Sequence, residues 1–384
     1  MSSNNFIPLS IPNLSGKELQ YVTEALTDGW VSSVGPHVDK FEKEFAAYNG
    51  SSYAIACMNG TAAIHVSLII CGVKPNDEVL APNLTFVAPL NAISYCGAFP
   101  VLLDSDWSTF GIDVDKLESF LKNETFEKDG FTYNKTSKRR IKAIIPMHSL
   151  GYSVEMDPLM LLCEKYNIDV IEDATESLGT EYKGKKTGNS GKLGCFSFNG
   201  NKIMTTGGGG MIVTNNPEYA KLAKHLTTTA KTDPIEYDHD SVGYNYRLVN
   251  VLAAIGLGQL EQMDDFVRIK RANLLKYKSK IDVLDGLSIH TEPKNTISNY
   301  WMYSLVLEKG YKHSVRQLVD IFSENKIQTR PIWKLMNSLP MYASCQSYHC
   351  DISLEIYNQV LSIPCSTSLT DADIDRVVNV LKSL

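Results

Sequence analysis

Lys202 is the residue whose type and setting point most directly to chemistry. It follows a short apolar run, and residues 194–202 read Gly-Cys-Phe-Ser-Phe-Asn-Gly-Asn-Lys. A lysine held unprotonated beside an aldehyde can form a Schiff base. Ser197, five residues earlier, can bond a phosphate. The glycines at 207–210 are typical of a phosphate cradle or of a tight turn, and the turn is favoured because no Gly-Lys-Ser/Thr sequence follows them.

Two acidic residues, Asp173 and Glu176, come after another apolar run at 169–171. The carboxyl ends of strands in an open α/β sheet border the ligand crevice. Asp173 could therefore keep the pyridine nitrogen of a ligand protonated, as an electron-withdrawing cofactor requires. The alternative is an aspartate that caps the next helix.

A third candidate is the pair Gly60 and Thr61, which precedes an apolar helical pattern. The free amide groups of a helix N-terminus and a threonine hydroxyl can bind phosphate there. A tight strand-to-helix turn uses the same residues. Residues 243–247 (Gly-Tyr-Asn-Tyr-Arg) add a cluster of polar and aromatic groups, which could equally be an ordinary helix start.

The elements that would position these residues alternate along the chain. Short apolar runs separated by helical segments predict an α/β fold, with a three-layer, mainly parallel sheet domain in residues 1–250. Residues 251–384 mix strands with amphipathic helices and predict a smaller α+β domain. We expect strands at 53–58, 78–81, 100–103, 143–147, 169–171, 195–198, 211–214 and 303–307, and helices at 61–70, 314–324 and 371–384.

Three further expectations concern single segments. Ser15 and Glu18 have the spacing of a capping box for a helix that ends near Leu26. A helical pattern from 248 to 281 predicts one long helix. The polar stretch 123–140 predicts an exposed hairpin or loop insertion, whose basic end could bind phosphate, although a solvated surface is favoured.

Composition limits the classes of partner. With 37 basic and 43 acidic side chains the net charge is −6, so neither nucleic acid nor a membrane is an expected partner. No secretory signal or membrane-spanning run is visible, and we expect a cytoplasmic protein. The eight cysteines lack metal-type spacing, which indicates reduced thiols. Cys345, His349 and Cys350 lie close together but lack a fourth ligand for zinc, so no metal is expected.

Taken together, these segments resemble the DegT/DnrJ/EryC1/StrS family of sugar aminotransferases, which are fold-type I pyridoxal phosphate enzymes. The resemblance covers nearly the whole chain. It rests on residues 29–33 (Gly-Trp-Val-Ser-Ser), 41–42, 59–63 (Asn-Gly-Thr-Ala-Ala), 82–88 (Pro-Asn-Leu-Thr-Phe-Val-Ala), 172–174 (Glu-Asp-Ala), 197–202 and 243–247.

The resemblance implies a role for each matching residue. Lys202 matches the lysine that forms the Schiff base with pyridoxal phosphate, and Asp173 matches the acid paired with the ring nitrogen. Asn245 matches a residue that reaches the phosphate from the neighbouring subunit, which implies a homodimer with active sites at the interface. The other cofactor-binding positions implied are Gly60, Thr61 and Ser197 at the phosphate, Phe86 stacked on the ring, and Glu176. The sugar-nucleotide site is expected to include Trp30, Ser32, Arg247, Arg330 and Trp333.

The implied reaction moves an amino group from L-glutamate, which leaves as 2-oxoglutarate, to the C4 ketone of a nucleotide-linked 4-keto-6-deoxy sugar. Two departures stand out: Glu176 replaces a frequent glutamine, and the glycine run lacks a frequent glutamate. With residues 330–333 and 339–342, they resemble the bacillosamine and legionaminic acid branch. That branch implies a UDP-2-acetamido-2,6-dideoxy-4-keto-hexose, with dTDP- or GDP-linked keto-sugars aminated at C3 or C4 as alternatives.

Three other classes fit less well. A sugar dehydratase of this family carries histidine where this chain has Lys202. A non-catalytic cofactor-binding regulator would need a DNA-binding extension or a basic domain. A Rossmann-type protein would need Gly-x-Gly-x-x-Gly at the start of a helix, followed by an acidic residue about 20 positions later.

Overall fold

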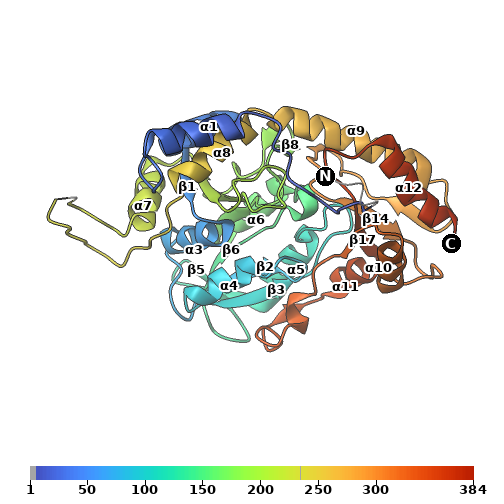
Figure 1. The fold of residues 1–384 in the computed structure, drawn as a ribbon. Coiled ribbons are helices and arrows are strands. Elements are labelled where there is room, and N and C mark those ends of the chain that lie inside the picture. Colours follow the sequence, from blue (N-terminus) through green and yellow to red (C-terminus); the bar gives the residue numbers. More distant parts are fainter. Residues whose placement is uncertain (1–5, 234) are drawn as a thin grey trace.

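The centre of the molecule is an eight-stranded sheet in a computed structural model that describes residues 6–233 and 235–384 (Figure 1). In spatial order its strands are β1 (Tyr53–Cys57), β11 (Gly210–Thr214), β10 (Leu193–Ser197), β7 (Asp169–Asp173), β6 (Ile141–Ile144), β2 (Glu78–Pro82), β3 (Phe99–Leu103) and β16 (Ser347–Tyr348). The strands from β10 to β16 are parallel, whereas β11 is antiparallel to both of its neighbours. The predicted mainly parallel sheet is confirmed.

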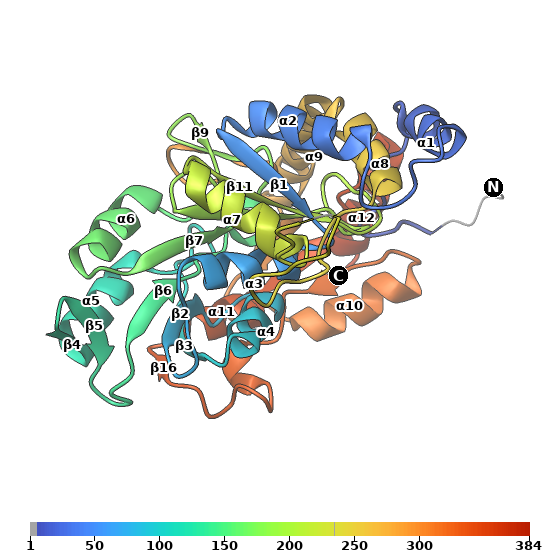
Figure 2. The same ribbon diagram turned by 90° about the vertical axis from the view of Figure 1, so that its left-hand side faces the viewer.

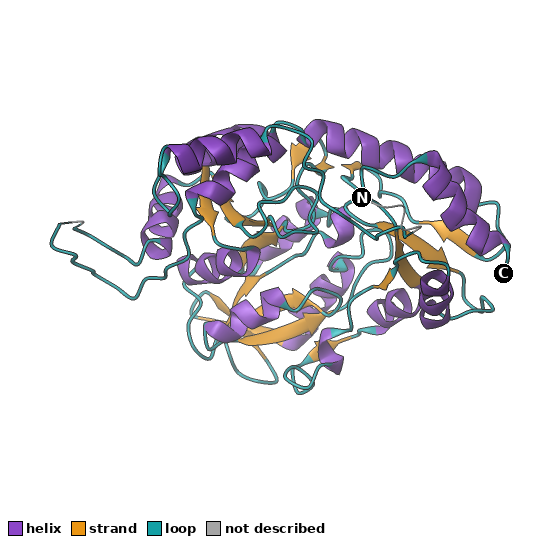
Figure 3. Cartoon of the chain, in the orientation of Figure 1, coloured by secondary structure: helices purple, strands orange, loops and turns teal. Residues whose placement is uncertain are grey.

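Helices cover both faces of this sheet, as Figure 3 shows. The helices of the described residues, including those of the second part of the chain, are α1 (Glu18–Thr27), α2 (Pro36–Asn49), α3 (Gly60–Ile70), α4 (Ala88–Tyr95), α5 (Val114–Glu124), α6 (Met156–Lys165), α7 (Pro217–Thr227), α8 (Asn250–Leu260), α9 (Met263–Ile281), α10 (Val315–Glu324), α11 (Asp351–Gln359) and α12 (Asp371–Lys382). Two 3₁₀ turns lie at Ser149–Gly151 and Met336–Ser338.

Alternating side chains of the strands build two cores. Ile55 and Cys57 of β1 pack with the helices α3, α4 and α7 on one face. Ala54 and Ala56 point the other way and pack with α2 and α8, while α5 and α6 cover the far half of that face. Figure 2 shows α3, α4 and α7 gathered on the same side of the sheet. The result is the predicted three-layer arrangement.

A second sheet lies beside the first, at the right of Figure 1. Its order is β12 (Leu287–Ile289), β14 (Tyr303–Leu307), β17 (Val360–Ile363) and β15 (Arg330–Pro331). The helices α9, α10 and α12 pack around it over a separate core. The short strands β4 (Thr125–Lys128), β5 (Phe131–Asn134), β8 (Glu181–Tyr182), β9 (Lys185–Lys186) and β13 (Thr296–Ile297) complete the set.

The two parts are connected by more than one segment of chain. The N-terminal residues Ile7 and Leu9 bond to the backbone of Lys326 and Cys365, which belong to the second part. Conversely, β16 crosses back and pairs with β3 at the edge of the large sheet. The boundary near residue 250 stays a prediction.

Two sequence expectations were wrong. The helix α1 has Lys17 as its N-cap with no side-chain cap, because Glu18 instead accepts hydrogen bonds from Gln259 (2.6 Å) and Gln262 (2.7 Å). The carboxylate joins α1 to α8 rather than closing a capping box. The predicted single helix over 248–281 is two helices: α8 is packed between α1 and α2, whereas α9 continues to the second sheet, so the chain changes direction between them.

The polar stretch 123–140 forms the predicted hairpin, built from β4 and β5. Its basic end is engaged within the fold: Arg140 makes a two-pronged pair with Asp77 (2.6 and 3.0 Å), and the Arg139 guanidinium lies 3.6 Å from the Phe99 ring centre. These contacts favour a structural role over phosphate binding.

Two features are absent from residues 6–233 and 235–384. No helix in that part of the chain has the length and apolar character needed to cross a membrane. Within the same residues no group of three or more His, Cys, Asp or Glu side chains is placed to hold a metal ion, and all eight cysteines are free thiols.

Candidate active site

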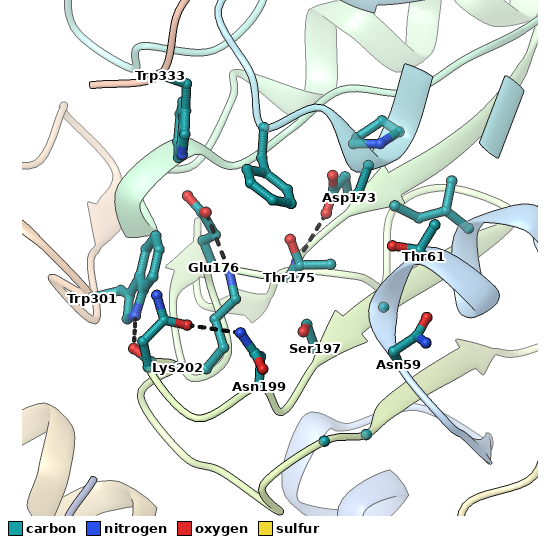
Figure 4. Close-up of a pocket in the computed structure, with 18 of the residues that line it drawn as sticks. Asn59, Thr61, Asp173, Thr175, Glu176, Ser197, Asn199, Lys202, Trp301 and Trp333 are labelled. Carbon is teal, nitrogen blue, oxygen red and sulfur yellow. Dashed lines mark hydrogen bonds and ion pairs between the residues drawn. The ribbon is translucent and has the colours of Figure 1, made fainter. Parts of the chain in front are cut away.

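A cavity of about 250 Å³ opens at the carboxyl ends of β7 and β10, next to the start of α3 (Figure 4). This is where an open α/β sheet is expected to bind its ligand. It is lined by Asn59, Gly60, Thr61, Ile64, Phe86, Ala88, Pro89, Asp173, Thr175, Glu176, Ser197, Asn199, Asn201, Lys202, Gly208, Gly209, Trp301, Arg330 and Trp333.

One end of the cavity is built to bind an anion. The helix α3 begins at Gly60, and Asn59 caps it by accepting from the Ala62 amide (2.8 Å). A Cβ atom at Gly60 would lie 2.9 Å from the Cβ of Ser197, so only glycine lets the helix start come this close to β10. The hydroxyls of Thr61 and Ser197 line the same end. A helix N-terminus with two hydroxyl donors fits a phosphate group.

Asp173, the last residue of β7, stands in the middle of the cavity and is buried. Burial raises the pKa of its carboxyl above the ordinary value, and hydrogen bonding from Thr175, whose amide lies 3.1 Å from Oδ1, opposes that shift. A buried carboxylate is stabilised by a cationic partner. Asp173 thus suits a ligand that presents a protonated ring nitrogen.

The neighbours of Asp173 hold its strand end in place. Glu172 accepts hydrogen bonds from the amides of Gly188 (2.8 Å) and Gly191 (2.6 Å). The Val154 amide donates to Nδ1 of His148, so the ring proton is on Nε2, which donates to Glu172 (3.0 Å). Burial alone would raise the pKa of Glu172, but the bonds from His148 and the two glycine amides hold it below its ordinary value.

The opposite end of the cavity contains Lys202. Its Nζ lies 3.2 Å from Oε1 of Glu176 and 4.1 Å from the ring centre of Trp301. Figure 4 shows the lysine side chain pointing at Glu176, with Trp301 beside it. Burial raises the pKa of Glu176 to about 7, against the opposing effect of the Lys202 charge. The amine is thus held by a carboxyl group that titrates near neutrality.

These groups fit pyridoxal phosphate in chemistry and in order. The start of α3, the buried Asp173 and Lys202 lie one after another along the same cavity. Gly60 leaves open the space that a side chain would fill. The group, when bound, supplies an electron sink and an aldehyde carbon that can carry an amino group.

The cavity brings together most of the predicted site residues. Those found in its lining are Gly60, Thr61, Phe86, Asp173, Glu176, Ser197, Lys202, Arg330 and Trp333. Four others are absent from the lining in the single chain. Arg247 lines a separate pocket, and the side chains of Asn245 and Trp30 are exposed. The backbone carbonyl of Ser32 accepts a hydrogen bond from the Asn250 amide (2.6 Å). Their assignment stays a prediction.

Trp301 is the main lining residue that the sequence did not reveal. It stands about a hundred positions after Lys202 in a stretch with no recognisable motif. Its Nε1 donates to the carbonyl of Asn201 (2.7 Å), which brings the two segments together. Asn59, Thr175, Asn199 and Asn201 were also missed, although all four adjoin residues that were singled out.

The sequence and the fold are similar to those of known sugar aminotransferases. Residues 12–382 match the model of the DegT/DnrJ/EryC1/StrS aminotransferase family. The chain is 38% identical to GDP-perosamine synthase of Caulobacter vibrioides, over 99% of both chains. It is 36% identical to GDP-perosamine synthase of Escherichia coli O157:H7, over 99% of this chain and 98% of the relative. The aminotransferase TlmJ of Streptoalloteichus hindustanus superposes with a TM-score of 0.88 at 25% identity, over 98% of both chains.

The chain therefore belongs to the DegT/DnrJ/EryC1/StrS aminotransferase family, as its sequence motifs indicated. It is a pyridoxal phosphate-dependent aminotransferase of nucleotide-linked sugars with the fold-type I architecture.

Proposed function

We propose that this enzyme transfers an amino group from L-glutamate to the C4 ketone of a GDP-linked 4-keto-6-deoxy sugar. The observation that carries the aminotransferase chemistry is the single cavity that joins Lys202, Asp173 and the start of α3. GDP is favoured as the nucleotide because three relatives with 38%, 36% and 31% identity are named GDP-perosamine synthase.

A UDP-2-acetamido-2,6-dideoxy-4-keto-hexose is the second candidate. It is favoured by the resemblance of residues 330–333 and 339–342 to the bacillosamine and legionaminic acid branch. Arg330 and Trp333 line the cavity, so this segment is placed to contact the sugar nucleotide.

In the proposed reaction, Lys202 would be the residue that holds the cofactor, and its Nζ would be free for proton transfer while the amino donor occupies the site. The freed Nζ then takes the proton from the amino-bearing carbon of L-glutamate. In the second half-reaction the same Nζ delivers a proton to C4 of the sugar. Asp173 keeps the ring nitrogen protonated throughout, and its buried position excludes water that would compete for that contact.

The first turn of α3, with Thr61 and Ser197, would anchor the phosphate group. Phe86 lies at the mouth of the cavity with half of its surface exposed, where it would stack on the ring. These contacts leave Lys202 free to move without loss of the cofactor.

We also propose a homodimer in which Asn245 of a second copy completes the phosphate site. Residues 228–233 and 235–249 lie between α7 and α8 and project from the body at the left of Figure 1. The apolar side chains of Ile235 and Val242 on this arm are 81% exposed, an arrangement that favours burial against another chain.

A subunit-mixing experiment tests the dimer. Lys202→Ala and Asn245→Asp subunits should each be nearly inactive, the second because it places a negative charge beside the phosphate. If Asn245 acts across the interface, mixed dimers contain one intact site, and a scrambled mixture should regain about a quarter of wild-type activity. No regain would place Asn245 in its own subunit's site, and an Asn245→Asp variant that is fully active by itself would place it outside any site.

The substrate is tested by a half-reaction. The purified protein is converted to its amino form with L-glutamate, and GDP-, UDP- and dTDP-linked 4-keto-6-deoxy sugars are added singly while the visible absorption of the cofactor is followed. Return of the band with the GDP-linked sugar supports the proposal, and return only with the UDP-linked 2-acetamido sugar supports the second candidate. A band that glutamate never bleaches would contradict L-glutamate as the donor.

A further inference from the structure

The amine of Lys202 lies between two groups of different character. Nζ is 3.2 Å from Oε1 of Glu176 and 4.1 Å from the centre of the Trp301 ring, and the lysine side chain is largely buried. The carboxylate attracts the ammonium group by charge, and the indole face attracts it through the ring's quadrupole. The lysine is thus held at a defined place while it is not bonded to the cofactor.

The carboxyl group of Glu176 is itself fixed. Its Oε2 accepts a hydrogen bond from the Leu150 amide (2.9 Å), which leaves Oε1 for Lys202. Leu150 has φ of 55°, a left-handed conformation that costs free energy in a residue other than glycine. The residue with the strained backbone is therefore the one whose amide orients the Glu176 carboxylate.

Trp301 is fixed at both its indole and its backbone. The indole Nε1 donates to the Asn201 carbonyl (2.7 Å), next to the lysine. Its backbone carbonyl accepts from Nζ of the buried Lys270 (3.1 Å), which belongs to α9. The ring face toward Lys202 is therefore set by partners on two different elements.

Asn299 connects the two holders of the amine. Its Nδ2 donates to the Glu176 carbonyl (3.0 Å) and to the Leu178 carbonyl (2.9 Å), and its Oδ1 accepts from the Trp301 amide (2.8 Å). Asn299 is completely buried, so these bonds do not compete with water. One side chain thereby bridges the backbones of Glu176 and Trp301.

We propose that Glu176 is a positioning residue that binds the free amine of Lys202 and accepts its proton, and that Asn299 sets the geometry of this contact. In the proton transfer an N–H bond of the Lys202 ammonium breaks and an O–H bond forms on Oε1 of Glu176. A neutral amine and a neutral carboxyl group result, and no other reactant is consumed. This inference rests on the proposed role of Lys202 as the residue that binds the cofactor.

The buried position of Glu176 increases the proton affinity of its carboxyl group. Burial raises the pKa of its carboxyl to about 7, and the charges of Lys202 and Asp173 act in opposite directions on it. A glutamine at this position would hold the amine by a hydrogen bond but could not accept its proton. Glutamate at position 176 can therefore exchange a proton with Lys202, whereas glutamine could only orient the amine.

The test is a pH titration of the visible absorption of the bound cofactor in the holoenzyme. A carboxylate beside the protonated nitrogen linking cofactor and lysine should favour protonation, so Glu176→Gln should lower the titration midpoint by about 1 unit or more. Glu78→Gln is the matched control. Glu78 is also buried, and burial also raises its pKa, but it is the first residue of β2, at the end of the strand away from the cavity. Its replacement should leave the midpoint unchanged.

An unchanged midpoint in Glu176→Gln would overturn the inference. If that variant loses the cofactor, the same question is put to the cofactor-free protein. Its lysines are then dimethylated with ¹³C-formaldehyde and a borane reductant, and the Lys202 NMR signal, identified by its absence in Lys202→Arg, is titrated in wild type, Glu176→Gln and Asn299→Ala. Both replacements should alter the titration of this signal, and identical curves in all three proteins would overturn the inference.

Borohydride reduction of the holoenzyme followed by peptide mapping separates this failure from that of the proposed function. A cofactor attached elsewhere than Lys202 contradicts the proposed function. Attachment at Lys202 with an unshifted midpoint contradicts only the role of Glu176.

Discussion

The two ends of the cavity are built in different ways. The phosphate end is formed by Asn59, Gly60, Thr61 and Ser197. Ser197 is the last residue of β10, and the other three form the N-cap and the first turn of α3. The lysine end joins Lys202 to Glu176, 26 residues earlier, and to Trp301 in the second part of the chain. The first end depends on backbone geometry, whereas the second depends on side chains brought together by the tertiary fold.

This difference matters for the reaction. The phosphate end has to hold one group in one place, and a helix start packed against a strand is rigid. The lysine end has to let an amine leave and return, and a side chain held by a carboxylate and an indole face can do so. We therefore expect replacements at the lysine end to remove chemistry and replacements at the phosphate end to weaken binding.

The largest effect is expected for Lys202→Ala. Because the amine moves every proton in the proposed reaction, turnover should fall by at least about 10³-fold. The cofactor should nevertheless be retained through the phosphate end. Turnover and the cofactor content after gel filtration measure the two separately, and a variant that still turned over substantially would remove Lys202 from the mechanism.

Asp173→Asn should have the next largest effect. It removes the charge that keeps the ring nitrogen protonated, and we expect kcat to fall by about 10²-fold. Asp104→Asn is the control, because Asp104 is equally buried but pairs with Lys116 outside the cavity. That control should lower stability and leave kcat near wild type. Equal losses of kcat in the two variants would contradict a specific role for Asp173.

The pH dependence of stability tests the lysine end when wild type is compared with Glu176→Gln. Folding raises the pKa of Glu176 from 4.5 to about 7. A carboxyl group shifted in this direction contributes stability that is present below pH 4.5 and is lost as the pH rises through 7. The cofactor-free wild type should therefore lose up to about 3 kcal/mol relative to Glu176→Gln over that window. Urea unfolding of both proteins at several pH values across this window measures the difference in the free energy of unfolding. If that difference did not change with pH, the raised pKa of Glu176 would be contradicted.

The smallest effect is expected at the phosphate end. In Gly60→Ala the new methyl group would lie 2.9 Å from the Ser197 Cβ, a clash that should cost about 1–3 kcal/mol of cofactor binding. Gly200→Ala is the control, since a Cβ there has no neighbour within 4 Å. Titration of cofactor-free protein with pyridoxal phosphate gives both affinities. If Gly200→Ala bound pyridoxal phosphate as weakly as Gly60→Ala, or more weakly, the close approach of α3 and β10 would be contradicted.

The same contrast explains what the sequence could predict. Alternating apolar runs and the Asn59-Gly60-Thr61 turn are local, so the strands, the three layers and the phosphate end follow from short segments. Trp301 and Asn299 act through contacts between segments about a hundred residues or more apart, and no local pattern marks them. The failed capping box has a similar cause, because Glu18 bonds to Gln259 and Gln262, more than two hundred positions away.

The last strand of the large sheet, β16, has a consequence for how the protein is made. Its residues 347 and 348 pair with β3, which is synthesised some 240 residues earlier. While the chain is still on the ribosome, the edge of β3 is complete in sequence but open to any other strand. The sheet can close only after residues 347 and 348 have emerged, so β3 is the edge at which a chaperone or a second nascent chain would compete with β16.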